Sequence, residues 1–146
     1  MERKDFIRTC CISVVGIPLA ASMLQSCSSI YYAKASRKNG MLQVRKREFT
    51  AGLTSEDKQR KFILLNVDFS EFPICLYRTG KDKYAASLLE CTHNGCELNV
   101  GGGIYTCPCH GAEFSVEGEV LEGPAEENLR TFEVEVDNEN IYIQIS

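Results

Sequence analysis

The carboxyl-terminal end of the chain alternates between apolar and polar side chains. The alternation runs through residues 129–136 and again through residues 141–146, with a polar turn at 137–139 between the two runs. A period of two residues is typical of a strand with one buried face, because successive side chains point to opposite faces of a sheet. The chain is therefore predicted to end in a β-hairpin.

Shorter apolar runs bounded by turn residues predict the remaining strands. Three consecutive glycines, Gly101 to Gly103, separate two of these runs and predict a hairpin turn. No repeat and no long amphipathic helix is evident, so we expect an all-β fold, an antiparallel sandwich or small barrel. The predicted strands cover residues 41–49, 61–67, 72–78, 84–89, 97–100, 104–107 and 114–121, the last with a turn at Glu117-Gly118.

The first 26 residues have the pattern of an export signal. A positively charged start, with Arg3, Lys4 and Arg8, precedes a mainly apolar stretch from Thr9 to Leu24. This stretch has 16 residues and contains a proline, and it is shorter than the ~20 residues that a spanning helix requires. Residues 1–26 are therefore expected to direct export, and residues 27–40, which are small, polar and basic, to form a flexible tether to one domain over residues 41–146.

Two short motifs refine the export prediction. Residues 3–8 resemble a twin-arginine signal with Lys4 in place of the second arginine, and that route carries proteins already folded with their cofactor. Leu24-Gln25-Ser26-Cys27 resembles a bacterial lipobox, which implies lipidation of Cys27 as the first mature residue. An uncleaved anchor and a plain cleaved signal are the alternatives. Cys10 and Cys11 are expected to be hydrophobic filler in the apolar stretch.

Cysteine and histidine gather in two segments. Cys91-Thr92-His93-Asn94-Gly95-Cys96 and Cys107-Pro108-Cys109-His110-Gly111 hold four of the eight cysteines and both histidines. Each segment offers a thiol and an imidazole two or three residues apart, so one loop can turn both toward a common centre. Two thiolates and two imidazoles fit a binuclear iron–sulfur cluster with two cysteines on one iron and two histidines on the other. A structural zinc site is the alternative.

Besides Cys91 and Cys107, the predicted domain contains three cysteines. Cys96 and Cys109 lie at matching places, one in each segment, where a disulfide could join the two loops. A disulfide in the mature fold indicates an oxidising compartment. Cys75 lies in an apolar run and is expected to pack as a small buried hydrophobe.

The two segments resemble the Rieske [2Fe–2S] family, whose motifs Cys-Thr-His-x-Gly-Cys and Cys-Pro-Cys-His-Gly are both intact here. The resemblance covers approximately residues 73–146 and implies two cluster-binding loops at one tip of the sandwich. Gly123-Pro124-Ala125 resembles the proline loop that covers the cluster in this family. The resemblance implies Cys91, His93, Cys107 and His110 as iron ligands, Cys96–Cys109 as the loop-bridging disulfide and Pro124 as a neighbour of the cluster.

Three positions depart from the pattern of quinol-oxidising family members. Where those proteins carry a serine and a tyrosine whose hydroxyls donate to cluster sulfurs, this chain has Ala112 and Phe114. The usual leucine at the tip of the first segment is replaced by Asn94, which makes the tip more polar. The loss of two donors predicts a lowered reduction potential.

Charge is distributed unevenly along the chain, whose net charge is −4. Nine Lys/Arg face three Asp/Glu over residues 34–61, and ten Asp/Glu face one Arg over residues 113–139. Solvated surface is the simple interpretation. The functional interpretation is that the basic region suits an anionic membrane surface and the acidic region steers a basic redox partner. No basic, aromatic helix of a nucleic-acid binder is present.

The resemblance and the amino-terminal motifs together predict a lipid-anchored, one-electron carrier on the periplasmic side of a bacterial membrane, with a redox partner protein and no enzymatic activity of its own. A Rieske subunit of a quinol-oxidising cytochrome b-type complex is the first alternative. The ferredoxin component of a Rieske-type oxygenase is the second, although such ferredoxins usually lack the pair formed here by Cys96 and Cys109.

Overall fold

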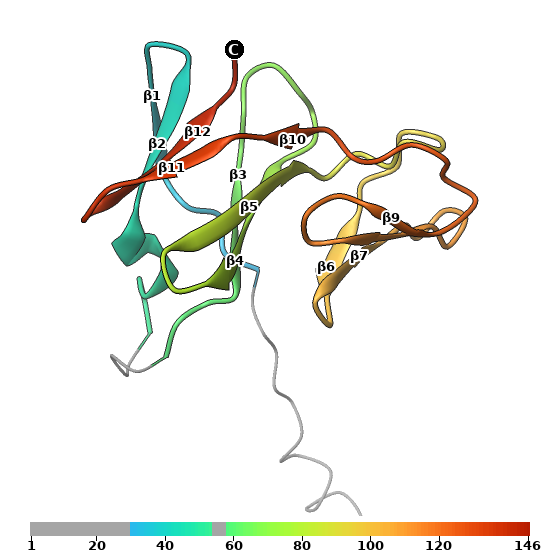
Figure 1. Ribbon diagram of the computed structural model, residues 1–146, viewed down its shortest axis with the longest axis horizontal. Helices are drawn as coiled ribbons and strands as arrows, with labels where there is room; N and C mark the ends of the chain where they lie inside the picture. The colour runs from blue at the N-terminus through green and yellow to red at the C-terminus, as the bar shows by residue number, and fades with distance from the viewer. Residues whose placement is uncertain (1–29, 54–57) are drawn as a thin grey trace, which may run out of the picture.

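Antiparallel β-sheets make up nearly all of the regular structure. The computed structural model describes residues 30–53 and 58–146, so the predictions for the export signal and Cys27 lie outside the described residues. Three four-stranded sheets have the strand orders β1-β2-β12-β11, β10-β5-β4-β3 and β6-β7-β8-β9. The first two sheets form a base on the left of Figure 1, and the third sheet lies to its right. The predicted all-β antiparallel class is confirmed.

The strands are short, and their bounds follow the predicted runs within a few residues, except at the two ends of the domain. A single 3₁₀ helix, Lys46–Phe49, follows β2 within the described residues. The strands are β1 (Ala35–Lys38), β2 (Met41–Arg45), β3 (Phe62–Leu65), β4 (Ile74–Gly80), β5 (Lys83–Leu88), β6 (Asn99–Gly101), β7 (Ile104–Thr106), β8 (Glu113–Ser115), β9 (Val120–Glu122), β10 (Thr131–Phe132), β11 (Val134–Val136) and β12 (Asn140–Gln144).

The base encloses one apolar core between its two sheets. On β2 and β12, burial alternates with the predicted period of two, and Ile141 lies opposite Val44 in the register. Apolar area removed from water stabilises the fold by roughly 25 cal/mol per Å². The buried members of this core are Leu42, Val44, Phe49, Ile63, Leu65, Ile74, Leu76, Ala86, Leu88, Ile141, Ile143 and Ile145.

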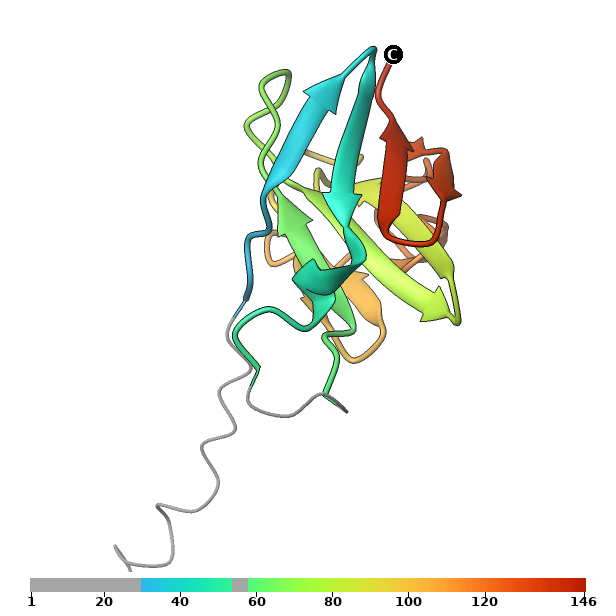
Figure 2. The same ribbon diagram turned by 90° about the vertical axis from the view of Figure 1, so that its left-hand side faces the viewer.

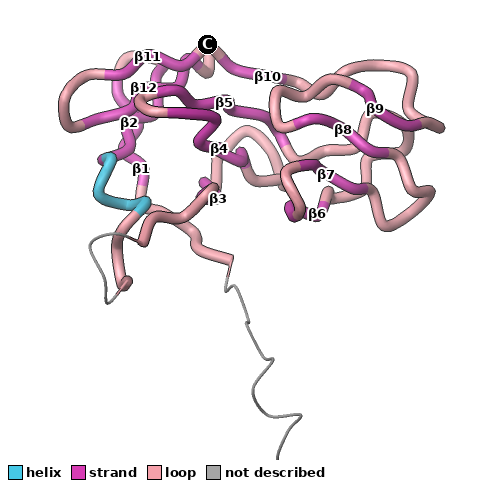
Figure 3. Tube along the Cα trace, turned by 60° about the horizontal axis from the view of Figure 1, so that its bottom comes forward, coloured by secondary structure: helices cyan, strands magenta, loops and turns pink. Residues whose placement is uncertain are grey.

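A second core joins the third sheet to the base. It includes Leu64 and Cys75 of the base together with Tyr105 and Phe114 of the third sheet. Cys75 is fully buried, as predicted, and burial raises the pKa of its thiol to about 12 although a hydrogen bond with the Tyr105 side chain lowers it. The third sheet is therefore held against the base rather than swinging from it, and the two parts lie side by side in Figure 3.

The predicted flexible tether is wrong over its described part. Residues 35–38 form β1, which pairs with β2 in a hairpin that Figure 2 shows clearly. The turn is Asn39-Gly40, where both residues have positive φ angles, +52° and +75°. Asn-Gly is a strong signal for a two-residue hairpin turn, because both residues tolerate the left-handed region. Tyr32 also bridges to Leu64, so the chain is packed from its first described residues.

Two of the predicted strands each form two elements in the structure. The run 41–49 ends as a strand at Arg45 and continues as the 3₁₀ helix. The run 129–136 divides into β10, which pairs with β5, and β11, which pairs with β12. This crossing links the two sheets of the base. No helix in residues 30–53 and 58–146 is long and apolar enough to cross a membrane.

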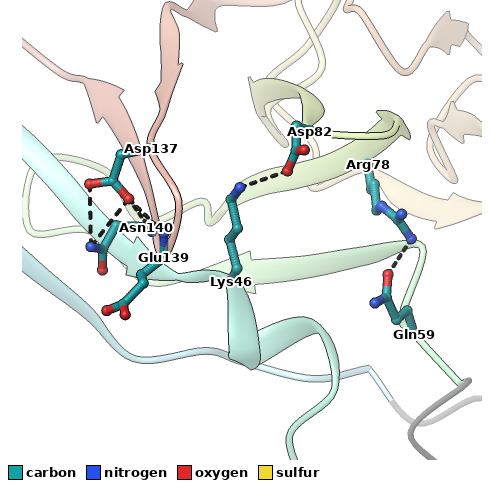
Figure 4. Close-up of polar contacts among 7 residues, drawn as sticks. All are labelled: Lys46, Gln59, Arg78, Asp82, Asp137, Glu139 and Asn140. Carbon is teal, nitrogen blue, oxygen red and sulfur yellow. Dashed lines mark hydrogen bonds and ion pairs between the residues drawn. The ribbon is translucent and has the colours of Figure 1, made fainter.

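The predicted terminal hairpin, β11–β12, is confirmed, and a carboxylate orders its turn. Asp137 Oδ1 accepts hydrogen bonds from the backbone N–H groups of Asn140 at 2.6 Å and Glu139 at 2.8 Å (Figure 4). These two donors, with the Tyr142 hydroxyl, hold the pKa of Asp137 at about 2. The turn therefore keeps a charged acceptor throughout the neutral range.

Gly118 is a position where a side chain has no room. Its φ is +90°, and a Cβ there would lie 2.7 Å from Thr131 Cγ2 and 3.3 Å from Leu129 Cβ. We predict that Gly118→Ala lowers the free energy of unfolding by about 1–3 kcal/mol from backbone strain alone, with steric overlap adding to it. Thermal unfolding of the cofactor-loaded protein would measure this loss.

Gly101→Ala is the matched control. Gly101 does not adopt a positive φ angle, and a Cβ there would meet no atom within 4 Å. The control should unfold at about the wild-type temperature. Equal destabilisation of both variants would contradict the account of Gly118.

Candidate metal centre

The two cysteine- and histidine-containing segments form loops with the same backbone hydrogen bonds. In the first loop, residues 91–96, the Cys91 N–H donates to Cys96 O at 2.9 Å and the Gly95 N–H to Cys91 O at 2.8 Å. In the second loop, residues 107–112, the corresponding bonds measure 2.8 Å and 3.0 Å. The fifth residue of each loop is a glycine with positive φ, +66° at Gly95 and +78° at Gly111. The chain therefore builds one loop shape twice.

The matched bonds define which residues of the two loops are equivalent. Cys91 corresponds to Cys107, and Cys96 corresponds to Ala112 rather than to Cys109. The disulfide cysteines thus do not occupy matching places, and that part of the sequence interpretation is wrong. The reason is that the second histidine lies one residue later in its loop than the first, so position three of the second loop is free for Cys109.

The four predicted ligands divide into a buried pair and an exposed pair. Cys91 and Cys107 are 1% and 3% exposed and belong to the second core. His93 and His110 are exposed, with ring centroids 5.1 Å apart and planes at 87°. The structure therefore brings the two imidazoles together at the surface above two thiols within the protein.

The thiols lie among opposing electrostatic influences. Burial raises the pKa of the Cys91 thiol, against the lowering effect of the His93 and Asn94 backbone N–H groups. Burial also opposes ionisation of Cys107, but the N–H groups of Cys109 and His110, with the Cys91 side chain, hold its pKa below the usual value. Hydrogen bonds to the sulfur favour the thiolate, which is the form that binds metal.

These four backbone donors were not predicted from the sequence. They come from the third and fourth residues of each loop, so the repeated loop shape supplies them twice. Any residue type other than proline carries such a donor, which is why no sequence signal marks them.

The predicted disulfide is present. Cys96 and Cys109 are joined with an S–S distance of 2.06 Å and a Cα–Cα distance of 6.5 Å. The sulfurs of Cys96, Cys107 and Cys109 lie within 4.8 Å of one another. Two of these three sulfurs are bonded to each other and are not thiolates, so this trio is not a ligand set. The disulfide instead ties the first loop to the second beside Cys107.

A third segment lies against the first loop. The Thr92 hydroxyl donates to the carbonyl of Glu127 at 2.7 Å, and Ala125 is buried in the second core. Pro124 is exposed in the same segment. The segment that contains Pro124 therefore runs beside the first loop.

The three residues that depart from the pattern of quinol-oxidising family members lie around the site. Ala112 and Phe114 are fully buried in the second core and carry no hydroxyl, whereas Asn94 is exposed at the tip. Tyr105, which the sequence interpretation did not single out, is the large polar side chain of this core. The Tyr105 hydroxyl donates to Val116 O at 3.2 Å. Burial raises the pKa of this hydroxyl, and the neighbouring Cys75 raises it further.

The donor set fits a two-iron cluster with unlike ends. Two soft thiolates lie inside and two imidazoles outside, which matches a [2Fe–2S] group with two cysteines on one iron and two histidines on the other. A single tetrahedral zinc would need all four donors around one point. The segregation into a buried and an exposed pair favours the cluster.

Comparison with known proteins agrees with this geometry. Residues 49–133 match the Rieske [2Fe-2S] domain family. The cytochrome b6-f complex iron-sulfur subunit of Synechococcus sp. (strain JA-2-3B'a(2-13)) is 42% identical over 53 residues, and that of strain RCC307 is 40% identical over 55 residues. These matches cover 35% and 36% of this chain and 31% of each relative, so the chain spans about a third of their length.

A solved structure extends the similarity beyond the loops. The cyanobacterial plasma membrane Rieske protein PetC3 from Synechocystis PCC 6803 is 36% identical, with a TM-score of 0.51. The alignment covers 57% of this chain and 85% of that one. Fold, loops and comparisons agree: the chain belongs to the Rieske [2Fe-2S] domain family.

Proposed function

We propose that the chain is a one-electron carrier that holds a [2Fe–2S] cluster through Cys91, Cys107, His93 and His110. The observation that supports this proposal most directly is the buried pair of thiols beneath an exposed pair of imidazoles. When bound, such a cluster supplies a one-electron couple, which accepts an electron from a reduced donor and passes it to an oxidised acceptor.

The side chains and backbone of the two loops have separate tasks in this proposal. The thiolates of Cys91 and Cys107 would anchor the cofactor within the second core, where backbone N–H groups offset their negative charge. The exposed imidazoles of His93 and His110 would form the contact edge for a partner.

We also propose that the protein is exported and attached to a membrane by a lipid on Cys27, on the periplasmic side. The lipobox-like residues 24–27 and the short apolar stretch support this. Packed structure is present five residues after Cys27, where Tyr32 bridges to Leu64. A similar solved protein is named as a plasma membrane Rieske protein.

A subunit of a quinol-oxidising cytochrome b-type complex is the second candidate. The relatives named as cytochrome b6-f complex iron-sulfur subunits favour it. Ala112, Phe114 and the polar Asn94 at the tip weigh against it. A role as an oxygenase ferredoxin is less favoured, because the Cys96–Cys109 disulfide is present.

The surface around the loops suits a cationic redox partner. Residues 84–129 contain eight glutamates and no Lys or Arg. Seven of these glutamates are exposed, and Glu113 is half-buried. Glu127 lies against the first loop through its bond from Thr92. A surface of one sign raises the rate of encounter with a partner of the opposite sign, and salt reduces that effect.

Loss of either imidazole tests the ligand assignment. We predict that His93→Ala or His110→Ala abolishes the EPR signal of the reduced protein, because the histidine-bound iron would lose a ligand. Asn94→Ala is the matched control in the same loop and should retain the signal. A wild-type spectrum in either histidine variant would remove that residue from the ligand set.

The missing hydroxyls predict a midpoint potential in the lower part of the Rieske range of ~ −150 to +300 mV. Hydrogen bonds to sulfur stabilise the reduced state more than the oxidised state, by ~1–2 kcal/mol per bond. For one electron, ~1.4 kcal/mol corresponds to ~59 mV. Ala112→Ser with Phe114→Tyr should therefore raise the potential by roughly 80–170 mV in protein-film voltammetry.

The same two chemical changes in the base provide the control. Ala85→Ser with Phe72→Tyr adds the two hydroxyls at half-buried positions of the base, and this variant should keep the wild-type potential. A wild-type potential near the top of the family range, or no rise in the test variant, would show that the backbone donors already replace the hydroxyls.

Salt dependence tests the acidic surface. Reduction of the cationic reagent hexaammineruthenium(III) by the reduced protein should slow as ionic strength rises, and reduction of anionic ferricyanide should accelerate. Glu126→Gln with Glu127→Gln should weaken both dependences. The control pair Glu133→Gln with Glu135→Gln, on or beside β11 in the base, should leave them largely unchanged. A cationic reagent insensitive to salt would contradict this surface assignment.

A further inference from the structure

A basic groove lies at the other end of the third sheet from the metal centre. The first loop leads into β6 and β7 leads into the second loop, so the glycine turn between β6 and β7 is at the far end of that hairpin. One side of the groove is this turn, and the other is the base. Its volume is about 740 Å³, and its lining is Ile30, Tyr31, Gln59, Arg60, Lys61, Phe62, Tyr77, Val100 and Gly101–Gly103.

Two cations of the groove also line a neighbouring hollow. Arg60 and Lys61 border a second depression of about 310 Å³, together with Arg78 and Lys81. The Arg78 side chain donates to Gln59 Oε1, as Figure 4 shows, so the two depressions share one ridge. In the described chain the acidic side chain of the β4–β5 turn, Asp82, is already paired with Lys46 at 2.6 Å.

Arg60 is held in place rather than free in solvent. Its guanidinium carbon lies 3.9 Å from the centroid of the Tyr31 ring, and its Nη1 donates to Glu48 O at 3.3 Å. Tyr31 is itself fixed by donating its hydroxyl to Glu48 Oε2 at 2.9 Å. Stacking on an aromatic face leaves a charged edge of the guanidinium open to an anion.

Exposed apolar side chains border the same region. Ile30 is 61% exposed and Tyr32 is 49% exposed. Few other large hydrophobic side chains of the described residues are exposed. Phe62 and Tyr77 stack with ring centroids 6.1 Å apart and line the groove. Cations beside tyrosine and aliphatic side chains are the composition of protein surfaces that lie at a lipid headgroup layer.

The charge of the wider region matches an anionic surface. Residues 30–83 contain twelve Lys/Arg and six Asp/Glu, whereas the 46 residues that follow contain no cation. Ile30, which is part of the lining, comes three residues after Cys27 in the sequence. Twenty-nine residues precede Ile30, and they include the apolar stretch proposed to bring the protein to a membrane.

We infer that this groove seats on the anionic phospholipid headgroups of the membrane to which the chain is attached. The inference rests on the membrane attachment proposed above. Its consequence is an orientation: with the groove against the headgroups, the loops at the opposite end of the β6–β7 hairpin point away from the membrane. The acidic surface around them would then face a partner in solution and not the anionic lipid.

Lysine acylation on vesicles tests this surface with the full chain. The protein is bound to vesicles of phosphatidylcholine alone or of phosphatidylcholine mixed with phosphatidylglycerol, and a water-soluble acylating reagent is added. Mass spectrometry then gives the acylation rates of Lys58 and Lys81, with Lys38 of the β1–β2 hairpin as the internal reference. We expect several-fold slower acylation of Lys58 and Lys81 on the anionic vesicles only, and loss of this protection at high salt.

Two double variants distinguish the effect of the groove cations from the effect of removing two positive charges elsewhere. Arg60→Gln with Lys61→Gln should abolish the protection of Lys58 and Lys81 while the protein stays on the vesicles. Arg37→Gln with Lys38→Gln is the matched control, with Lys34 as its reference, and it should keep the protection. Equal rates on both vesicle types, or protection that survives the Arg60/Lys61 change, would overturn the inference. Protection by a soluble polyglutamate peptide but not by anionic vesicles would assign the groove to a protein partner and also overturn it.

The outcome is distinguishable from failure of the attachment itself. A chain that does not float with neutral vesicles lacks the proposed lipid anchor. Salt-sensitive protection on anionic vesicles would still uphold the groove in that case. A chain that floats with both vesicle types but shows no protection keeps the anchor and loses the groove.

Discussion

The metal centre depends on one constraint: two thiols must be buried side by side while two imidazoles stay in water. A single loop cannot satisfy both demands, because it supplies only one buried thiol and one exposed imidazole. The chain meets them by building the same hydrogen-bonded loop twice, with each cysteine at the start of its loop and each histidine at its tip. The disulfide then joins the last residue of the first loop to the third residue of the second loop.

The rest of the fold supports that arrangement. Each loop is framed by paired backbone, the first by an isolated β-bridge between Glu90 and Glu97 and the second by the β7–β8 pair of Thr106 and Glu113, so neither loop projects from unpaired chain. The second core carries both thiols and also reaches Leu64 and Cys75 of the base. Movement of the third sheet would therefore expose apolar surface and the sulfurs together. The order of the metal centre therefore depends on the packing of the third sheet against the base.

Most of the site could be predicted from sequence because its chemistry uses scarce residues. Both histidines and four cysteines fall in two short segments, which identifies the ligands and the disulfide partners as candidates. Their geometry could not be predicted in the same way. The backbone donors have no side-chain signature. The unequal spacing of Cys96 and Cys109 from their ligand cysteines is visible in the sequence, but the hydrogen bonds that pair Cys96 with Ala112 are not.

The fold shows the same division. Alternation in residues 141–146 and the glycine turn predicted hairpins that are present, since both signals are local. The Asn39-Gly40 turn is also a local signal, and it explains the strand within the predicted tether. The division of residues 129–136 between two sheets was not available, because it depends on pairing with β5 and β12, which lie far away or later in the sequence.

Mössbauer spectroscopy with metal and sulfide analysis of protein purified from its native host tests the central claim most directly. The account predicts two irons and two acid-labile sulfides per chain. In the reduced state it predicts two unlike iron sites, a ferric site bound by cysteine and a ferrous site bound by histidine. One zinc per chain without iron or sulfide would contradict it, and so would two spectroscopically equivalent irons in the reduced protein.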